Sequence, residues 1–540
     1  MAAARLRILA LSAAMLAPFA SAAPDGAPAE TPAAKRPNIL FFITDDQFKD
    51  MMNWLPEGAG QNLTPETDRL AAGGTVMARQ YVTSPVCTPS RYACLTGQYP
   101  SRSTEKSFVR TTKQNGGQAV VQWNTFIRPG QLCLPSKLRE AGYFTGFVGK
   151  NHVVDSEYQS PGWKADPLDE KTKSLLAENA RRQAETVKSI GFDFAASLYH
   201  NNPAENGVQA LASHNLDWIA KGALDFLSQT GDKPFFLYLA TTVPHGPAEP
   251  DRSWNADRRI TSEGLTAEPL AVLPDKSTFK DRLKAAGIKG SQKENLLWMD
   301  DLLAAVVNKL KETGQLDNTI ILYFNDNGQK AKGTIYDGGV HCESFVWRQG
   351  GFPAGHICEV PVSNIDFAPT LLDLAGVKYD PSDFDGRSFA PVLMGEKPAD
   401  RPLFFELGYV RGVRLGDWKY IALRYPKNAT EMTVEKRQAA LEEFNADQER
   451  KGRPVYTRDP MKPFSHVMLV PGGGDAEHMS MESYPGFYDA DQLYNIAEDP
   501  DEQHNLAGEP AHNQKLEEMK KLLQKQLADL PGTFGEIKTD

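Results

Sequence analysis

The chain has 540 residues, of which 41% are hydrophobic, and a formal net charge of −10 at pH 7. This length and composition allow a large buried core, in two domains or in one large domain with an appendage, and exclude a disordered chain. The acidic balance argues against nucleic-acid binding, because phosphate contacts need a basic face. An anionic ligand would need a local basic pocket.

The first 22 residues have the pattern of a signal peptide. Two arginines precede an apolar run at 8–20, and a small-x-small cleavage site follows at 20–22. The run is too short to cross a membrane, so we favour cleavage over a membrane anchor. We expect an exported protein, periplasmic or secreted, in which the Ala/Pro-rich residues 23–35 form a linker.

Four continuous apolar runs predict strands that are buried on both faces of a sheet. The runs span residues 38–44, 144–148, 235–240 and 319–324, and helical patterns lie between them at 216–227 and 296–310. This alternation predicts an α/β fold with a large, mostly parallel sheet flanked by helices. Such sheets bind their ligands outside the carboxyl ends of the strands.

The pattern changes near residue 398, where an acidic, Pro-containing stretch indicates a domain boundary. We expect a catalytic domain over 36–398 and a smaller α+β domain over 399–540. Short alternating runs near 416–421 predict an antiparallel sheet, and 511–530 reads as one amphipathic helix. Two segments have no clean period: 155–191 carries no prediction, and 425–485 is interpreted as a long substrate-shaping insertion.

One short stretch, residues 84–97, combines a helix start, an anion site and a cysteine. Pro89 suits the first position of a helix, and Gly97 suits the left-handed residue that ends one. Cys87 is therefore expected at a helix N-terminus, where free amides can bind an anion, with Arg91 one turn further on the same face. Taken alone, Cys87 is favoured as a structural thiol or half of a disulfide.

Polar residues directly follow each predicted strand, so they are expected to converge. Asp45 and Asp46 follow the first strand, and Asp326 and Asn327 follow the last. Three carboxylates and an amide are hard oxygen donors that suit Ca²⁺ better than Zn²⁺, although each could singly be a strand cap or turn residue. Sulfur at Cys87 would be a poor ligand for Ca²⁺, whereas an oxygen made by its oxidation would be a good one.

The remaining strand ends carry basic groups. Lys150 and His152 follow the second strand, and on an extended segment both would face the same side. His245 follows the third strand, and Lys332 comes shortly after the fourth. Cleavage of an anionic ester needs a proton donor and fixed cations. The imidazoles can supply the first, and the lysines together with Arg91 can supply the second.

These motifs resemble the formylglycine-dependent (type I) sulfatases of the alkaline-phosphatase-like superfamily. Residues 87–91 form the family's C-x-P-S-R pattern, and the resemblance extends from residue 37 to about 508. It includes Asp45-Asp46, Asp326-Asn327, Gly-Lys-x-His at 149–152, Pro-His-x-Pro at 244–247, Lys332, and Leu-Tyr-Asn at 493–495. Two positions depart from the family pattern: Asn151 replaces a tryptophan, and His341-Cys342-Glu343 replaces Arg-Val-Pro.

The resemblance implies that a formylglycine-generating enzyme oxidises Cys87 to formylglycine (3-oxoalanine) before folding. The hydrate of this residue would be the nucleophile, bound to Ca²⁺ together with Asp45, Asp46, Asp326 and Asn327. Arg91, Lys150 and Lys332 would hold nucleophile and sulfate, while His245 protonates the leaving alcohol and His152 accepts a hydroxyl proton. The expected reaction is hydrolysis of a sulfate monoester, on a sulfated carbohydrate, with neither a nucleic-acid partner nor a membrane anchor.

Several alternatives stay open. A phosphate or phosphonate monoester hydrolase would share this site, and a non-catalytic glycan-binding protein would keep the fold with Cys87 unconverted. A zinc phosphatase is disfavoured, because the two histidines are needed for proton transfer. Four further cysteines, Cys94, Cys133, Cys342 and Cys358, do not fix a pairing, but Cys342 with Cys358 is the favoured disulfide because a short loop joins them.

Overall fold

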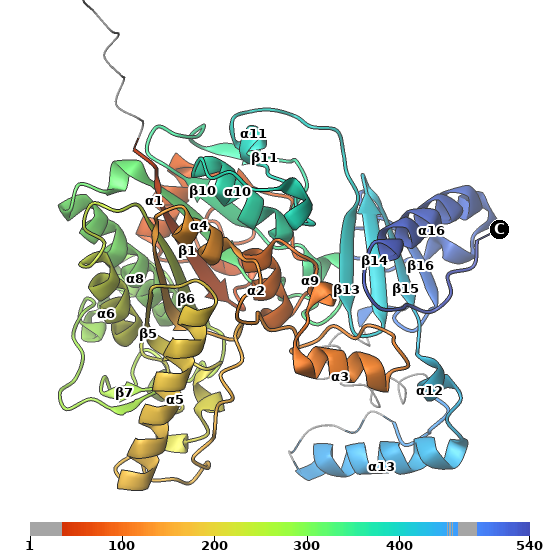
Figure 1. Ribbon diagram of the computed structural model, residues 1–540, viewed down its shortest axis with the longest axis horizontal. Coiled ribbons are helices and arrows are strands. Elements are labelled where there is room, and N and C mark those ends of the chain that lie inside the picture. Colours follow the sequence, from red (N-terminus) through yellow and green to blue (C-terminus); the bar gives the residue numbers. More distant parts are fainter. Residues whose placement is uncertain (1–34, 451, 453–454, 456, 463–482, 540) are drawn as a thin grey trace, which may run out of the picture. The chain divides into compact units, whose positions relative to one another are not determined.

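A sheet of eight strands carries most of the core (Figure 1). The computed structural model describes residues 35–450, 452, 455, 457–462 and 483–539, so the predicted signal peptide and part of the expected insertion lie outside the described residues. The strand order is β11-β2-β10-β9-β1-β6-β4-β5. The bounds are β1 Asn38–Asp45, β2 Thr75–Met77, β4 Phe144–Lys150, β5 Phe194–Tyr199, β6 Phe235–Pro244, β9 Thr319–Asn325, β10 Ser344–Trp347 and β11 His356–Cys358.

The five strands β9, β1, β6, β4 and β5 are mutually parallel, and β10 joins antiparallel to β9 and β2. The expectation of a large, mostly parallel sheet is thereby confirmed, and each of the four apolar runs forms one of its strands. Parallel neighbours present their carboxyl ends at the same edge of the sheet. The residues that follow β1, β4, β5, β6 and β9 therefore come out on one side.

The side chains of β1 alternate between two hydrophobic cores, as a strand that is buried on both faces must. Leu40 and Phe42 pack with α1 (Pro65–Gly73), α6 (Leu216–Leu227) and α8 (Lys293–Glu312) on one face. Phe41 and Ile43 pack on the other face with α2 (Cys87–Thr96), α4 (Leu134–Glu140) and α10 (Phe367–Leu374). Figure 1 shows these helices on the two faces of the sheet.

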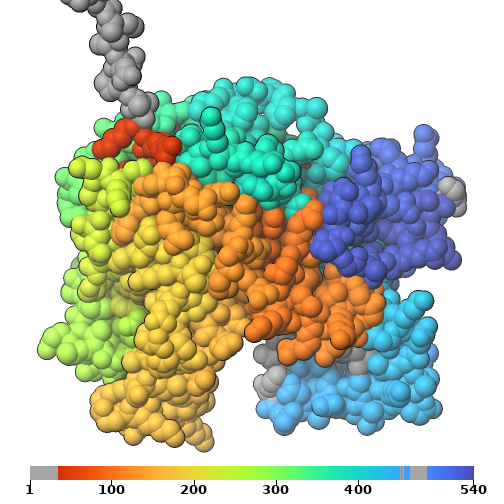
Figure 2. Space-filling view, viewed as in Figure 1, coloured from red at the N-terminus to blue at the C-terminus, as the bar shows by residue number. Residues whose placement is uncertain are grey.

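A separate antiparallel sheet follows the large one along the chain. It consists of β13 (Leu403–Leu407), β14 (Val410–Leu415), β15 (Trp418–Leu423) and β16 (Asp491–Asn495), and α16 (Asn513–Ala528) packs on it. The predicted small sheet and terminal helix are confirmed. The described residues from 36 onward form one compact unit, and the domain boundary at residue 398 stays a prediction. In Figure 2, the orange residues of α3 (Lys106–Gln114) border the blue C-terminal residues, and Ala119 N–H donates to Thr533 O at 3.2 Å.

The other elements are short, apart from two helices. They are β3 Gln80–Tyr81, β7 Ile260–Thr261, β8 Gly264–Leu265, β12 Val362–Ser363, α5 Glu170–Ser189, α7 Phe279–Ala285, α9 Asp337–Val340, α11 Ala390–Leu393, α12 Lys427–Thr430 and α13 Val434–Arg450. The helix α5 lies in a segment for which the sequence predicted no structure. Its buried stripe includes Asn179 and Gln183, so the apolar period is interrupted.

The helix α2 begins earlier than its sequence predicts. It starts at Cys87, so Pro89 is the third helical residue and not the first. Extended Val86 is the cap, and its carbonyl accepts the Ser90 N–H at 3.1 Å. A proline is tolerated at this third position because the first amides of a helix have no intrahelical acceptor. Gly97 ends the helix in the left-handed conformation, as predicted.

The favoured disulfide between Cys342 and Cys358 is wrong, because all five cysteines, each in the described part of the chain, are free. Ser344, which starts β10, and Cys358, which ends β11, both pair with Met77 of β2, from opposite sides. Two strands that flank a third are about 10 Å apart. A disulfide requires Cα atoms within roughly 7 Å.

We expect Gly97→Ala to destabilise the protein, because Gly97 has φ +64° and an added Cβ would lie 2.5 Å from Cδ1 of Phe384. The left-handed conformation alone costs an alanine about 1–2 kcal/mol. Gly376→Ala is the matched control, since Gly376 has the same φ of +64° and no described atom within 4 Å of its added Cβ. Urea unfolding should show the larger loss for Gly97→Ala; equal losses would contradict the packing argument.

The buried side chain of His214 is expected to make the stability of the folded protein depend on pH. It is 1% exposed, its Nδ1 lies 2.8 Å from Thr242 Oγ1, and burial lowers its pKa to about 3. Between about pH 6.5 and 3, His214 binds a proton in the unfolded chain but not in the folded chain. Its contribution to the free energy of unfolding is therefore complete above pH 6.5 and falls as the pH drops. The His214→Asn variant keeps a polar contact to Thr242 without titrating. Its melting temperature should fall less steeply over this window than that of the wild type; equal slopes would contradict the assignment.

Candidate active site

The ends of β1 and β9 bring together the acidic residues that follow them. Thr44 pairs with Asn325, and the Asn325 side chain accepts from Gln47 N–H at 3.0 Å and donates to Gln47 O at 2.8 Å. These bonds tie the two strand ends together. As a result Asp46 N–H donates to Asp326 Oδ1 at 3.3 Å, although the residues are 280 positions apart.

A cluster of possible metal ligands forms at this junction. One atom each from Asp45, Asp46, Cys87 and Asp326 lies within 4.8 Å of all the others. Asn327, the fourth oxygen donor expected from the sequence, donates from Nδ2 to Asp326 Oδ1 at 2.9 Å, so its amide borders the same cluster. The arrangement offers hard oxygen atoms at the spacing that a divalent cation requires.

The sequence did not predict a role for Gln329, which touches this cluster. Its Nε2 donates to Asp46 Oδ1 at 2.9 Å and to Asn327 Oδ1 at 2.6 Å. The residue follows β9 by four positions, and proximity to a predicted strand end is the signal that could have identified it. Its amide holds the side chains of Asp46 and Asn327 in fixed positions.

Cys87 lies at the first position of α2 and is 2% exposed. Its Sγ is 3.5 Å from Asp45 Oδ1 and 3.8 Å from Lys332 Nζ. Burial, with the negative charge of Asp326 nearby, raises the pKa of the thiol, which therefore stays protonated at neutral pH. An unmodified Cys87 is thus a weak nucleophile in this environment.

Three cations neutralise the carboxylates. Lys150 Nζ lies 2.5 Å from Asp45 Oδ2, and Lys332 Nζ lies 2.6 Å from both carboxylate oxygens of Asp46. Arg91 donates to Asp326 Oδ2 from Nε at 3.1 Å and from Nη2 at 2.9 Å. The side chains of Arg91 and Lys150 are completely buried. Buried charges are tolerated when they are paired in this way.

The pKa values of the two fully buried carboxylates are displaced in opposite directions. Burial alone would raise the pKa of Asp45, but Lys150, His245 and Arg91 together hold it well below its usual value. Burial raises the pKa of Asp326, and Arg91 opposes the shift without cancelling it. Asp45 is therefore the more firmly ionised member of the pair.

His152 lies against the start of α2. Its Nε2 is 2.9 Å from the Thr88 hydroxyl. Its φ of +41° shows that the segment from Lys150 to His152 is not extended. Lys150 nevertheless contacts Asp45, and His152 lies against Thr88, the residue after Cys87. Burial and the adjacent Lys150 hold the pKa of His152 well below its usual value, so the ring is neutral and can accept a proton.

His245 faces the cluster from the end of β6. Its Nδ1 lies 2.9 Å from the carbonyl oxygen of Gly246, which can only accept, so Nδ1 carries the proton. Its Nε2 lies 3.5 Å from Asp46 Oδ2 and 3.0 Å from Asn202 Nδ2. Asn202 is a second residue that the sequence analysis missed, because it follows β5, a strand that the analysis did not predict.

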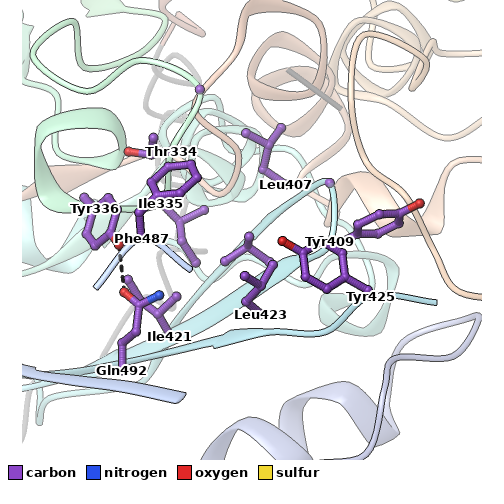
Figure 3. Close-up of a pocket in the computed structure, with 13 residues that line it drawn as sticks. Thr334, Ile335, Tyr336, Leu407, Tyr409, Ile421, Leu423, Tyr425, Phe487 and Gln492 are labelled. Atoms are coloured by element: carbon purple, nitrogen blue, oxygen red, sulfur yellow. Dashed lines mark hydrogen bonds between the residues drawn. The ribbon is translucent and has the colours of Figure 1, made fainter. Parts of the chain in front are cut away.

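An apolar pocket lies beside the Lys332 segment (Figure 3). Gly333 lines it, and Gly333 N–H donates to Pro85 O at 3.1 Å, two residues before Cys87. Figure 3 shows side chains from three stretches of the chain around this pocket, namely Thr334, Ile335, Tyr336, Leu407, Tyr409, Ile421, Leu423, Tyr425, Phe487 and Gln492. Its lining suits the apolar face of a ring more than a charged group.

Comparisons with known proteins identify the family of this chain. A family model described as sulfatase matches residues 37–377. The chain is similar to the extracellular sulfatase SULF-1 homolog of Drosophila melanogaster, with 28% identity over 68% of this chain and 32% of that protein. It is similar to human N-acetylglucosamine-6-sulfatase, with 27% identity over 67% of this chain and 65% of that protein. The chain thus spans between about a third and two thirds of these relatives.

The fold is similar to the crystal structure of Ps i-CgsB in complex with k-i-k-neocarrahexaose. The TM-score is 0.54, with 21% identity over 91% of this chain and 93% of that one. The family model spans well over half of the chain, and it includes each acidic, basic and cysteine residue of the cluster described above. On this match, the chain belongs to the sulfatase family.

Proposed function

We propose that this chain is an exported sulfatase, which hydrolyses sulfate monoesters of carbohydrates after Cys87 is converted to formylglycine. One observation carries the proposal: ligand atoms of Asp45, Asp46, Asp326 and Cys87 lie within 4.8 Å of one another at the start of a helix. Arg91, Lys150 and Lys332 surround this cluster with positive charge, which suits a bound sulfate.

The donor set fits Ca²⁺ only if residue 87 offers oxygen. Carboxylate and amide oxygens suit this hard cation, whereas sulfur does not. In its hydrated form, formylglycine would supply two hydroxyl groups: one would bind the ion and act as the nucleophile, and the other would give its proton to His152. Asp45, Asp46, Asp326 and Asn327 would hold the ion beside them. Bound Ca²⁺ supplies positive charge that favours the ionised form of a coordinated hydroxyl.

The side chains of this site divide the remaining work. Lys150 and Lys332, each within 2.6 Å of a carboxylate, carry the positive charge that would hold the sulfate oxygens. His245 keeps a proton on Nδ1, so Nε2 is the ring atom that would donate a proton to the leaving alcohol oxygen from the imidazolium form. His152 is neutral and would accept a hydroxyl proton at the Thr88 side of the site.

More general observations support the proposed substrate class and location. Human N-acetylglucosamine-6-sulfatase, by its name, acts on a sulfated amino sugar, which supports a carbohydrate sulfate as substrate here. The signal-peptide pattern at 1–22 supports export, and a relative is named an extracellular sulfatase. No helix in the described ranges is long and apolar enough to cross a membrane.

Two alternatives differ from the proposed sulfatase, one in its preferred substrate and the other in the mass of the peptide that contains Cys87. A phosphonate or phosphate monoester hydrolase should turn over an aryl phosphonate faster than the matching aryl sulfate. A glycan-binding protein with unconverted Cys87 should show the unmodified mass of the peptide that contains Cys87. The site has two histidines in different surroundings, His152 at Thr88 and His245 at Asp46, and this favours catalysis over binding alone.

Replacing Cys87 by alanine should abolish sulfate release. Because a nucleophile acts together with its partners, its loss is expected to lower kcat by several orders of magnitude. Turnover of an aryl sulfate by purified enzyme measures this directly. Cys358→Ala, another buried free cysteine but at the far edge of the sheet, is the control and should retain activity. Full activity of the Cys87→Ala variant would refute the proposal.

Calcium should stabilise the converted protein through Asp46. A ligand at 100 times its Kd stabilises the folded state by about 2.7 kcal/mol. The melting temperature should therefore fall when EGTA is added and recover with excess Ca²⁺. Asp46→Asn should remove this response, whereas Asp317→Asn, which changes an exposed carboxylate at the opposite end of β9, should keep it. Recovery with Zn²⁺ but not with Ca²⁺ would contradict the proposed metal.

A further inference from the structure

A polar loop after β5 borders the proposed active site. We call residues 200–206, with the sequence His-Asn-Asn-Pro-Ala-Glu-Asn, the asparagine loop. It leaves the same edge of the sheet as the segment that carries Lys150 and His152, since β4 and β5 are parallel. His152 N–H donates to His200 O at 3.2 Å, so the loop lies directly beside the proposed base.

The asparagine loop also contacts the proposed acid. Asn202 Nδ2 lies 3.0 Å from His245 Nε2, the atom that faces Asp46. Since Nδ1 of this ring carries the proton, Nε2 accepts the amide hydrogen. In the proposed reaction Nε2 must instead meet the leaving alcohol. Asn202 therefore lies where the alcohol part of a substrate has to arrive.

Several buried polar atoms in this region have no hydrogen-bond partner among the described residues. They are Nδ1 of His152 and of His200, Oδ1 of Asn201 and of Asn202, and both Oδ1 and Nδ2 of the completely buried Asn206. Buried polar groups in folded proteins are normally paired, and leaving them unpaired costs free energy. A ligand rich in hydroxyl groups would supply partners to the atoms that face it.

The buried groups of the asparagine loop are neutral. Its polar side chains are three amides and one imidazole, apart from Glu205, which is exposed. Burial lowers the pKa of His200, and its ring stacks on Tyr158 with centroids 4.6 Å apart. Neutral amides and imidazoles pair with hydroxyl groups, whereas a second sulfate would require a cation.

We propose that the asparagine loop recognises the sugar that bears the scissile sulfate, through hydrogen bonds between the amide groups of Asn201 and Asn202 and free hydroxyl groups next to the leaving oxygen. This rests on the proposed sulfatase function. Asn202 exchanges its bond to His245 Nε2 for a bond to the sugar, which leaves Nε2 open to the leaving oxygen. Recognition of the sugar and access to the acid are thereby linked.

The test compares a sugar sulfate with an aryl sulfate that lacks hydroxyl groups. The sugar probe is the best substrate of the wild type in a panel of monosulfated galactose, glucosamine, galactosamine and fucose. For Asn202→Ala, kcat/KM for the sugar relative to that for the aryl sulfate should fall at least tenfold, mainly through KM. Asn318→Ala, at the amino end of β9 and so at the opposite edge of the sheet, should leave the ratio unchanged.

Asn201→Ala separates recognition from positioning, because Asn201, unlike Asn202, has no hydrogen bond to His245 among the described residues. Its KM for the sugar sulfate should rise at least threefold while its KM for the aryl sulfate stays the same. If Asn202→Ala lowers kcat equally on both substrates and leaves KM unchanged, Asn202 is a positioning residue for His245 and the proposal is overturned. A wild-type enzyme that turns over the aryl sulfate but no sugar sulfate would also overturn the proposal and leave the sulfatase function standing. Inactivity of the wild type on every sulfate ester would overturn both the loop proposal and the sulfatase function.

Discussion

The balance between three carboxylates and three cations at the ends of parallel strands is the constraint on which the site depends. Asp45, Asp46 and Asp326 would repel one another if they were brought together without compensation. Lys150, Lys332 and Arg91 compensate them, and the Asn325–Gln47 bonds tie β1 to β9 at the correct register. The large hydrophobic cores on both faces of the sheet supply the stability that allows so many charges to be buried.

Much of this could be predicted because the signals are local. A strand buried on both faces reads as a continuous apolar run, and the polar residue that ends the run marks the edge of the sheet where ligands are expected to bind. In this way β1, β4, β6 and β9 were found, and with them Asp45, Lys150, His245 and Asp326. The sequence places the start of α2 two residues too late, because a proline is tolerated at any of the first positions of a helix.

The rest could not be predicted because its signals are not local. The helix α5 buries Asn179 and Gln183 where an amphipathic helix normally buries apolar side chains. The strand β5 lies at the sheet edge with three half-buried residues, so it lacks a continuous apolar run, and Asn202 was missed with it. The disulfide expected between Cys342 and Cys358 depended on loop length, but the intervening strand β2 separates the two strands.

The depth of Cys87 has a consequence for the biogenesis of the protein. At 2% exposure, in a helix whose every residue is buried, the side chain cannot be reached by another macromolecule once the chain has folded. If a maturation enzyme converts this residue, conversion and folding compete in time, and the faster of the two decides the fate of each molecule. The active fraction of a preparation would then be fixed by kinetics during synthesis, and no later incubation could increase it without unfolding.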